Sequence, residues 1–243
     1  MRIAVISDIH GNAHALDAVL ADVARARPDA VWCLGDLVGY GPDPNRSTSL
    51  TAAHADISLA GNHDLGVLGT IAVEEFSPDA LASALWTRET LDVEARDFLA
   101  SLAPAHATSR AELFHASPRD PIWEYVVTAD AAAAALDDTT APVVLVGHSH
   151  VALAIVRPEG GALAGGLAPG GKTVDLATGR WLLNPGSVGQ PRDGDPRAAW
   201  LLLDFRGGSA AFHRVEYDIA STQREIREAG LPEGLAKRLE LGA

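Results

Sequence analysis

The sequence contains little cysteine and few basic residues. Its single cysteine, Cys33, excludes an internal disulfide and leaves no set of thiolates for a metal site. Cys33 lies inside an apolar run before Gly35, so we predict a buried and unreactive side chain. Only 19 lysines and arginines stand against 32 acidic residues, which gives a formal net charge of −13. This charge repels long polyanions and no basic patch interrupts it, so we expect no long nucleic acid as a partner.

Long apolar runs are absent as well. No segment approaches the roughly 18 apolar residues of a membrane-spanning helix, and the N-terminus lacks the pattern of a signal peptide. The sequence therefore predicts a cytoplasmic protein with no membrane partner. The chain has 243 residues, of which 47% are hydrophobic, and this suffices to bury the core of one large domain. Because no repeat or long linker divides the chain, we expect residues 1–243 to form a single domain.

The first half of the chain alternates strands and helices. The pattern predicts a strand at 2–7, a helix at about 13–26 with Asn12 as its N-cap, and a strand at 31–34. A strand, helix, strand unit of this kind implies a parallel sheet. Between residues 77 and 102 the pattern is helical, with Ser77 and Asp92 as helix caps, and these helices are expected to cover one face of the sheet.

Strands dominate the second half of the chain. Turn signals separate them, so this half is interpreted as an antiparallel meander that completes a second sheet. The resulting expected fold class is α/β, a four-layer sandwich of two mixed β-sheets flanked by helices. The strands are predicted at residues 143–146, 152–156, 173–176, 181–183, 198–205 and 210–217.

Two further segments have simple interpretations. The Gly-rich segment 160–171 lacks the Gly-Lys-Ser/Thr ending of a phosphate-binding loop, so a flexible hairpin connection is predicted. After Asp218, the pattern predicts two short helices separated by Gly230 and Pro232.

Side chains suited to binding metal gather where predicted strands end. Four of five groups directly follow an apolar run, so a sheet would carry them to one edge. Imidazole nitrogens mixed with carboxylate and amide oxygens suit borderline metals such as Mn, Fe, Co, Ni or Zn, whereas an all-oxygen set would favour Mg or Ca. The groups are Asp8 with His10, Asp36, Asn62 with His63, His115, and His148 with His150.

The spacing within these groups leaves some roles open. Alternate residues of an extended segment face the same way, but a tight turn would aim His148 and His150 at different ions. Two ions need a bridging group, and Asp36, just after the glycine that ends a strand, is the natural candidate. The alternative role for Asn62 is to cap a turn. Isolated histidines are usually surface or satisfied polar residues, so no function is assigned to His14, His54, His106 and His213.

Together these motifs resemble the ordered signature of the calcineurin-like metallophosphoesterase superfamily, in particular its small bacterial and archaeal phosphodiesterase-like members. The resemblance spans residues 8–188, and five elements in the same order make chance agreement a poor explanation. Ala116 departs from the pattern, since relatives commonly have glycine after the histidine. The matching elements are Asp8-Ile9-His10, Gly35-Asp36, Gly61-Asn62-His63-Asp64, His115, Gly147-His148-Ser149-His150 and Asn184-Pro185-Gly186-Ser187-Val188.

The resemblance implies two divalent transition-metal ions, Mn, Fe, Ni or Zn. It also implies that His63 lies beside the scissile phosphate and stabilises the transition state or protonates the leaving oxygen. Asp64 would lie behind His63 and favour its charged form. The implied ligands are Asp8, His10, Asp36 and His150 for one ion, and Asp36, Asn62, His115 and His148 for the other.

The implied activity is hydrolysis of a small phosphoester by in-line attack of a metal-bridging hydroxide, with no protein nucleophile. Two divalent ions, two carboxylates and one hydroxide leave a site of about +1, which attracts a compact anion. A phosphodiesterase is favoured. The alternatives are a phosphomonoesterase acting on phosphoproteins or nucleotides and, less favoured, a non-catalytic metal-binding scaffold.

The remaining expectations concern the surroundings of the site. Arg46 and Arg192 are candidates for contact with a substrate phosphate but are left outside the catalytic set. Three tryptophans, Trp86, Trp123 and Trp200, would contribute to a homo-oligomer surface if they are exposed. The substrate pocket is expected to be built from the loops 39–48, 65–77, 116–127 and 186–196.

Overall fold

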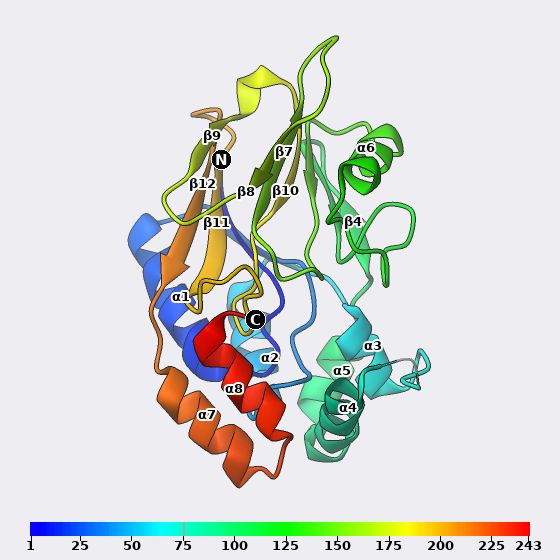
Figure 1. Ribbon diagram of the computed structural model, residues 1–243, viewed down its shortest axis with the longest axis vertical. Helices are drawn as coiled ribbons and strands as arrows, with labels where there is room; N and C mark the ends of the chain where they lie inside the picture. Colours follow the sequence, from blue (N-terminus) through cyan, green and yellow to red (C-terminus); the bar gives the residue numbers. More distant parts are fainter. Residues whose placement is uncertain (75) are drawn as a thin grey trace.

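Two six-stranded β-sheets, packed face to face, form the centre of this computed structural model, which describes residues 1–74 and 76–243 (Figure 1). Helices cover the outer faces, so the layers run helices, sheet, sheet and helices. Both sheets contain parallel and antiparallel pairs. The expected fold class, two mixed sheets flanked by helices, is therefore confirmed.

The first sheet joins the two ends of the sequence. In sheet order, its strands are β3 (Ile57–Ser58), β2 (Ala30–Cys33), β1 (Arg2–Ile6), β11 (Ala198–Asp204), β12 (Ser209–Val215) and β9 (Thr173–Asp175). β1, β2 and β3 are parallel, whereas β11, β12 and β9 add antiparallel pairs. The parallel part is the half of this sheet from which candidate ligands emerge.

The second sheet comes from the middle of the chain. In sheet order, its strands are β4 (Ala105–Ala107), β5 (Ala111–Phe114), β6 (Val143–Leu145), β10 (Arg180–Asn184), β7 (Leu153–Arg157) and β8 (Ala164–Leu167). β5, β6 and β10 are parallel, and the outer strands pair antiparallel. The carboxyl ends of β5 and β6 therefore lie at the same edge of this sheet.

Strand β1 illustrates how the layers hold together. Ile3 and Val5 pack in the core between the sheets, together with Leu183 of β10. Ala4 and Ile6 point the other way and pack in the cluster that contains helix α1 (Ala13–Ala26). Successive side chains of a strand alternate between faces, so β1 is buried on both.

Helices within the described residues follow the predicted pattern in part. The predicted helix at 13–26 is α1, whose N-cap Asn12 accepts a hydrogen bond from the backbone of Ala15. Ser77 and Asp92 cap α4 and α5 as predicted. The two predicted C-terminal helices are α7 and α8, whereas α2 and α3 were not anticipated. The helices are α1 (Ala13–Ala26), α2 (Pro44–His54), α3 (Asn62–Leu68), α4 (Pro78–Thr90), α5 (Val93–Ala100), α6 (Ala129–Asp137), α7 (Ile219–Glu228) and α8 (Glu233–Leu241).

The second half of the chain does not form the single antiparallel meander that the turn signals predicted. β9, β11 and β12 join the N-terminal sheet, and β10 pairs in parallel with β6. The reason is burial on both faces of β11: Leu201 and Leu203 pack between the sheets, while Ala198 and Trp200 pack in the cluster with α1. A strand with two apolar faces belongs in the middle of a sheet.

Three smaller expectations have clear outcomes. The Gly-rich segment contains strand β8, and a Cβ at Gly165 would overlap the Ala154 carbonyl of β7, so the glycine permits close pairing rather than flexibility alone. Trp200 is fully buried and therefore cannot contribute to an oligomer surface. Cys33 is fully buried as predicted, and burial raises the pKa of its thiol.

Among the described residues, no helix is both long and apolar enough to cross a membrane.

Candidate metal centre

The candidate ligands lie on turns at the carboxyl ends of strands in both sheets. Asp8 follows β1 and Asp36 follows β2 in the first sheet. His115 directly follows β5, and His148 lies just beyond β6, in the second sheet. Asn62 is the first residue of α3. The face-to-face packing of the sheets brings these turns together.

The backbone of these turns is unusual. Non-glycine residues with positive φ are uncommon, and a strained backbone of this kind costs on the order of 1–3 kcal/mol per residue unless the surroundings enforce it. Five of the seven candidate ligands adopt it. They are Asp8 (φ 54°), His10 (φ 51°), Asp36 (φ 54°), His148 (φ 62°) and His150 (φ 59°).

Glycines permit the close approach that these turns require. Gly35 has a φ of 101°, and a Cβ there would lie 2.8 Å from the backbone nitrogen of Gly61. A Cβ at Gly61 would overlap the Asp36 carboxylate, and one at Gly147 would overlap the Ser7 hydroxyl. A side chain at any of these three glycines would therefore disturb the turns that carry the candidate ligands.

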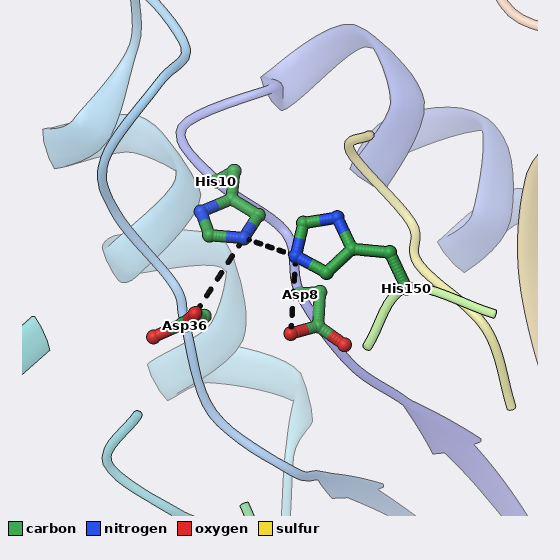
Figure 2. Close-up of side chains that lie close together, drawn as sticks. All are labelled: Asp8, His10, Asp36 and His150. Atoms are coloured by element: carbon green, nitrogen blue, oxygen red, sulfur yellow. Dashed lines mark hydrogen bonds and ion pairs between the residues drawn. The ribbon is translucent and has the colours of Figure 1, made fainter. Parts of the chain in front are cut away.

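A first group of four side chains converges at the end of β1 (Figure 2). The Nε2 atoms of His10 and His150 are 3.0 Å apart. His150 Nε2 lies 3.6 Å from Asp8 Oδ1, and His10 Nε2 lies 3.6 Å from Asp36 Oδ2. Ligands about 2.1 Å from one ion and at right angles to each other would lie about 3.0 Å apart, so these separations suit a shared cation. The group comprises Asp8, His10, Asp36 and His150.

A second group shares Asp36 with the first. Asp36, His115 and His148 offer ligand atoms within 4.8 Å of one another. Asp36 Oδ2 lies 3.5 Å from His115 Nε2. The amide oxygen of Asn62 is 3.3 Å from the same His115 nitrogen, which places it beside this group. The tight turn after β6 therefore puts His148 and His150 in different groups.

Backbone carbonyls fix the orientation of three imidazoles. The Nδ1 atoms of His10, His115 and His150 lie 3.0, 2.9 and 2.6 Å from the carbonyl oxygens of Val38, Leu34 and Gln190, respectively. A carbonyl only accepts hydrogen bonds, so each Nδ1 carries the proton and each Nε2 presents a lone pair. Supporting contacts of this kind orient the histidine ligands of metal sites.

The lone pairs of the converging nitrogen and oxygen atoms repel one another, and a bound cation would remove this repulsion. Two imidazole lone pairs 3.0 Å apart, on His10 and His150, repel each other unless a positive charge lies between them. Asp8 Oδ2, Asp36 Oδ2 and His148 Nε2 are buried and have no hydrogen-bond partner among the described residues. Orphaned buried acceptors of this kind are costly. These donor atoms therefore fit divalent metal ions well.

Burial favours the form of each histidine that can bind metal. Desolvation lowers the pKa of His115 to about 3 and that of His148 to about 4, and it lowers the pKa values of His10 and His150 well below the usual range. Neutral imidazole is the ligand form. Desolvation also raises the pKa of Asp8 to about 7. The charged form of this buried carboxylate is therefore unfavourable without a compensating cation.

His63 lies at the same centre, but Asp64 does not support it as expected. The centroids of the His63 and His10 rings are 4.8 Å apart, and within residues 1–74 and 76–243 no partner forms a hydrogen bond with His63 Nδ1. Asp64 instead accepts hydrogen bonds from the backbone of Leu37, Val38 and Gly61. Both Asp64 oxygens are thus used by the backbone, because the first turn of α3 aims this side chain at the turn after β2. The expected contact between Asp64 and His63 is therefore wrong.

The expected charged state of His63 is also not favoured by the protein alone. Desolvation, followed by the nearby positive charge of Arg192, lowers the pKa of His63 well below the usual range.

The Asn184–Val188 segment holds the two halves of the centre together. Asn184 donates hydrogen bonds to the Gly147 carbonyl and the Ser149 hydroxyl, which fixes the turn that carries His148 and His150. Ser187 donates to the Asp8 carbonyl. This motif thus links the turn after β6 to the turn after β1, which explains its presence in the sequence signature.

A cavity of about 480 Å³ opens beside the two groups. Each of the four expected loops contributes to its wall, through Tyr40, Phe76, Trp123 with Tyr125, and Arg192. Arg46 does not, since it forms an exposed ion pair with Asp17. Helix α8 adds Arg238, which sequence reasoning missed because no local motif ties a C-terminal helix to this site.

The aromatic lining lies against the histidines. The Tyr125 ring stacks on His148 with centroids 4.1 Å apart, and the Phe76 ring lies 4.9 Å from that of His63. Phe76 contacts Trp123 edge to face at 5.7 Å. Trp123 therefore belongs to the cavity wall, where the sequence had suggested an oligomer surface.

Two mixed sheets with carboxylates and imidazoles converging at their strand ends define a metallophosphoesterase fold. The family model of the calcineurin-like phosphoesterase superfamily domain matches residues 1–208. The chain belongs to this superfamily, which supports a phosphoester hydrolase that uses divalent metal ions.

Individual relatives agree with this membership. An uncharacterised protein of Methanocaldococcus jannaschii is 39% identical, with 99% of this chain and 98% of that protein covered. The crystal structure of a metallophosphoesterase from Sphaerobacter thermophilus has a TM-score of 0.90 at 43% identity, covering 100% of this chain and 99% of that one. A hypothetical protein from Pyrococcus horikoshii shares the fold, with a TM-score of 0.81 at 20% identity and coverage of 100% and 98%.

Gly61→Ala should weaken metal binding, because the added methyl group would displace the Asp36 carboxylate. Gly61 has a φ of −101°, so alanine adds no backbone strain there. We expect a loss of about 10- to 100-fold in metal affinity, as for other disturbed metal surroundings, measured by metal titration. Gly161→Ala is the matched control, because its Cβ would meet only the Pro158 side chain, at 3.2 Å. Unchanged metal affinity in Gly61→Ala would contradict the placement of Asp36.

Proposed function

We propose that the protein is a dinuclear-metal-dependent phosphodiesterase. The observation that carries this proposal is the sharing of Asp36 by two ligand groups that open onto one cavity. We further propose that residues 1–243 act as a single domain, since β1 and β11 pair along four residue positions from opposite ends of the chain.

The proposed ligand sets follow the two groups. Asp36 is the bridging ligand, because its Oδ2 lies 3.6 Å from His10 Nε2 and 3.5 Å from His115 Nε2. The mixture of nitrogen and oxygen donors favours Mn, Fe, Ni or Zn over Mg or Ca. The ligands are Asp8, His10, Asp36 and His150 for one ion, and Asp36, Asn62, His115 and His148 for the other.

The protein side chains then position the substrate and move a proton. Bound divalent ions would supply an activated water and the positive charge that holds the phosphate oxygens. His63 lines the cavity and is proposed to donate a hydrogen bond or a proton to the leaving oxygen. Asp64 is proposed as a positioning residue, which ties the start of α3 to the turn after β2.

The cavity favours a diester over a monoester. A diester has organic groups on both sides of the scissile phosphate, whereas a monoester has one. Besides the ligands, the cavity of about 480 Å³ is lined by Tyr125, which stacks on His148, and by Arg192, whose backbone amide donates to the His150 carbonyl, so its wall has groups that could contact the organic parts of a diester. A phosphomonoesterase remains the second candidate, since the same centre would bind either ester.

His63→Ala and His150→Ala should separate catalysis from metal binding. We expect His63→Ala to retain both ions and lose about 10²- to 10⁴-fold in kcat, because it removes a proton donor but no ligand. His150→Ala should lose turnover and bind metal more weakly, because it removes a ligand of the first ion. Metal content and kcat are measured on the same preparations.

His14→Ala is the control for these variants, because His14 lies away from the centre and pairs with Glu225 at 2.9 Å. It should keep wild-type metal content and kcat. A fully active His63→Ala enzyme would exclude the proposed role of His63.

A panel of aryl phosphodiesters and matched phosphomonoesters tests the proposed reaction. Metal-stripped protein is supplied in turn with Mn, Fe, Ni and Zn, and kcat/KM is compared within each pair. We expect the diester to be preferred with the best ion. A monoester preference would establish the second candidate. Chelator-insensitive protein with no hydrolysis under any ion would instead support a non-catalytic scaffold.

A further inference from the structure

Two arginines from distant parts of the chain meet over one tyrosine in the cavity wall. The guanidinium carbons of Arg192 and Arg238 lie 5.6 and 5.9 Å from the centroid of the Tyr40 ring. Both arginines donate to the same acceptor, Gln190 Oε1, at 2.9 and 3.4 Å. Arg192 comes from the segment after β10 and Arg238 from α8, so the pairing depends on tertiary structure.

Within the part of the chain that the structure describes, neither guanidinium has an acidic side chain as an ion-pair partner. Among residues 1–74 and 76–243, neither Arg192 nor Arg238 forms an ion pair, whereas Arg46, Arg214 and Arg227 each pair with an acidic side chain. Arg192 Nε is also buried, and no described residue offers it a hydrogen bond. What sets Arg192 and Arg238 apart is that they share one acceptor, Gln190 Oε1, in the wall of the cavity. Like charges in this arrangement repel each other unless an anion joins them.

The arginine pair adjoins the metal centre. The Arg192 backbone amide donates to the His150 carbonyl at 3.1 Å. The Tyr40 ring, on which both arginines lie, is 4.4 Å from the His63 ring and 4.7 Å from the His10 ring. Both guanidiniums line the cavity that opens at Asp36. A group bound by these arginines would therefore lie next to a phosphate held at the centre.

We propose that Arg192 and Arg238 bind a second phosphate group of the substrate, next to the phosphate that is hydrolysed. This inference rests on the proposed function and narrows its substrate class to phosphodiesters that carry a neighbouring phosphate. Guanidinium groups bind phosphate oxygens in a bidentate manner, and such charge-assisted hydrogen bonds are among the strongest. Tyr40 and Gln190 serve as positioning residues, because they hold the two guanidiniums side by side.

A matched pair of substrates tests the second-phosphate site. Two substrates are compared: the thymidine dinucleotide, whose two nucleosides are joined by one phosphodiester, and the same dinucleotide with an additional 5′-terminal phosphate. The measured ratio is kcat/KM for the phosphorylated dinucleotide divided by kcat/KM for the unphosphorylated one. We expect the wild-type enzyme to prefer the phosphorylated dinucleotide by about 10-fold or more, the usual worth of one hydrogen bond to a charged group. Arg192→Gln and Arg238→Gln should each bring the ratio close to one. The ratio cancels any general loss of activity caused by misfolding or by weaker metal binding.

Arg46→Gln is the control, because it removes an arginine of the same protein whose partner is Asp17 and not the cavity. Its ratio should equal that of the wild type. A wild-type enzyme without preference, or a preference that survives in both cavity variants, would overturn the proposed site.

A binding measurement separates this inference from the proposed function. Calorimetry on the metal-loaded protein compares methylenebisphosphonate with methylphosphonate, neither of which needs to be hydrolysed. We expect the bisphosphonate to bind more tightly, by about 10-fold or more, and the difference to disappear in Arg238→Gln. Protein that hydrolyses no phosphoester but shows this difference would contradict only the proposed function. Protein that hydrolyses diesters without this difference would contradict only the second-phosphate site.

Discussion

The Asp36 carboxylate, buried between two sets of imidazoles, is the constraint on which the rest of the site depends. Its Oδ1 accepts the backbone amide of His63 at 2.9 Å, so the start of α3 is fixed against the end of β2. Its Oδ2 is left free to face His10 and His115. Gly61 must lack a side chain for the carboxylate to fit. The two sheets must therefore stack so that the carboxyl ends of their parallel strands lie next to each other.

Burying these carboxylates costs free energy when no cation compensates their charge. Asp8, Asp36 and Asp64 are buried close together, and desolvation raises the pKa of each, to about 6 for Asp64. Backbone amides satisfy Asp64, whereas Asp8 and Asp36 each keep one oxygen that no described residue hydrogen-bonds. Strained backbone, orphaned acceptors and unpaired arginines thus gather in one cavity. Departures from ordinary folding rules concentrate at functional sites, where a ligand compensates for them.

Much of the fold and of the candidate metal centre was predictable from the sequence, for identifiable physical reasons. Helix α1 and the strands around it follow from apolar periodicity, and the ligand positions follow from polar residues placed just after strands. The partners of β11 did not follow, because turn signals locate strand ends but do not specify which strand lies alongside. Asp64 was misplaced because adjacency in sequence does not determine where a helical side chain points. Arg238 was missed because only tertiary packing brings α8 to the cavity.

Metal stoichiometry in two single variants tests the bridging role of Asp36 most directly. After reconstitution with manganese, the wild-type protein should hold about two ions and His115→Ala about one, since His115 contacts only the second group. Asp36→Asn should hold close to none, because both groups lose their shared carboxylate. If Asp36→Asn instead keeps as much metal as His115→Ala, Asp36 serves one ion alone and the shared centre does not exist.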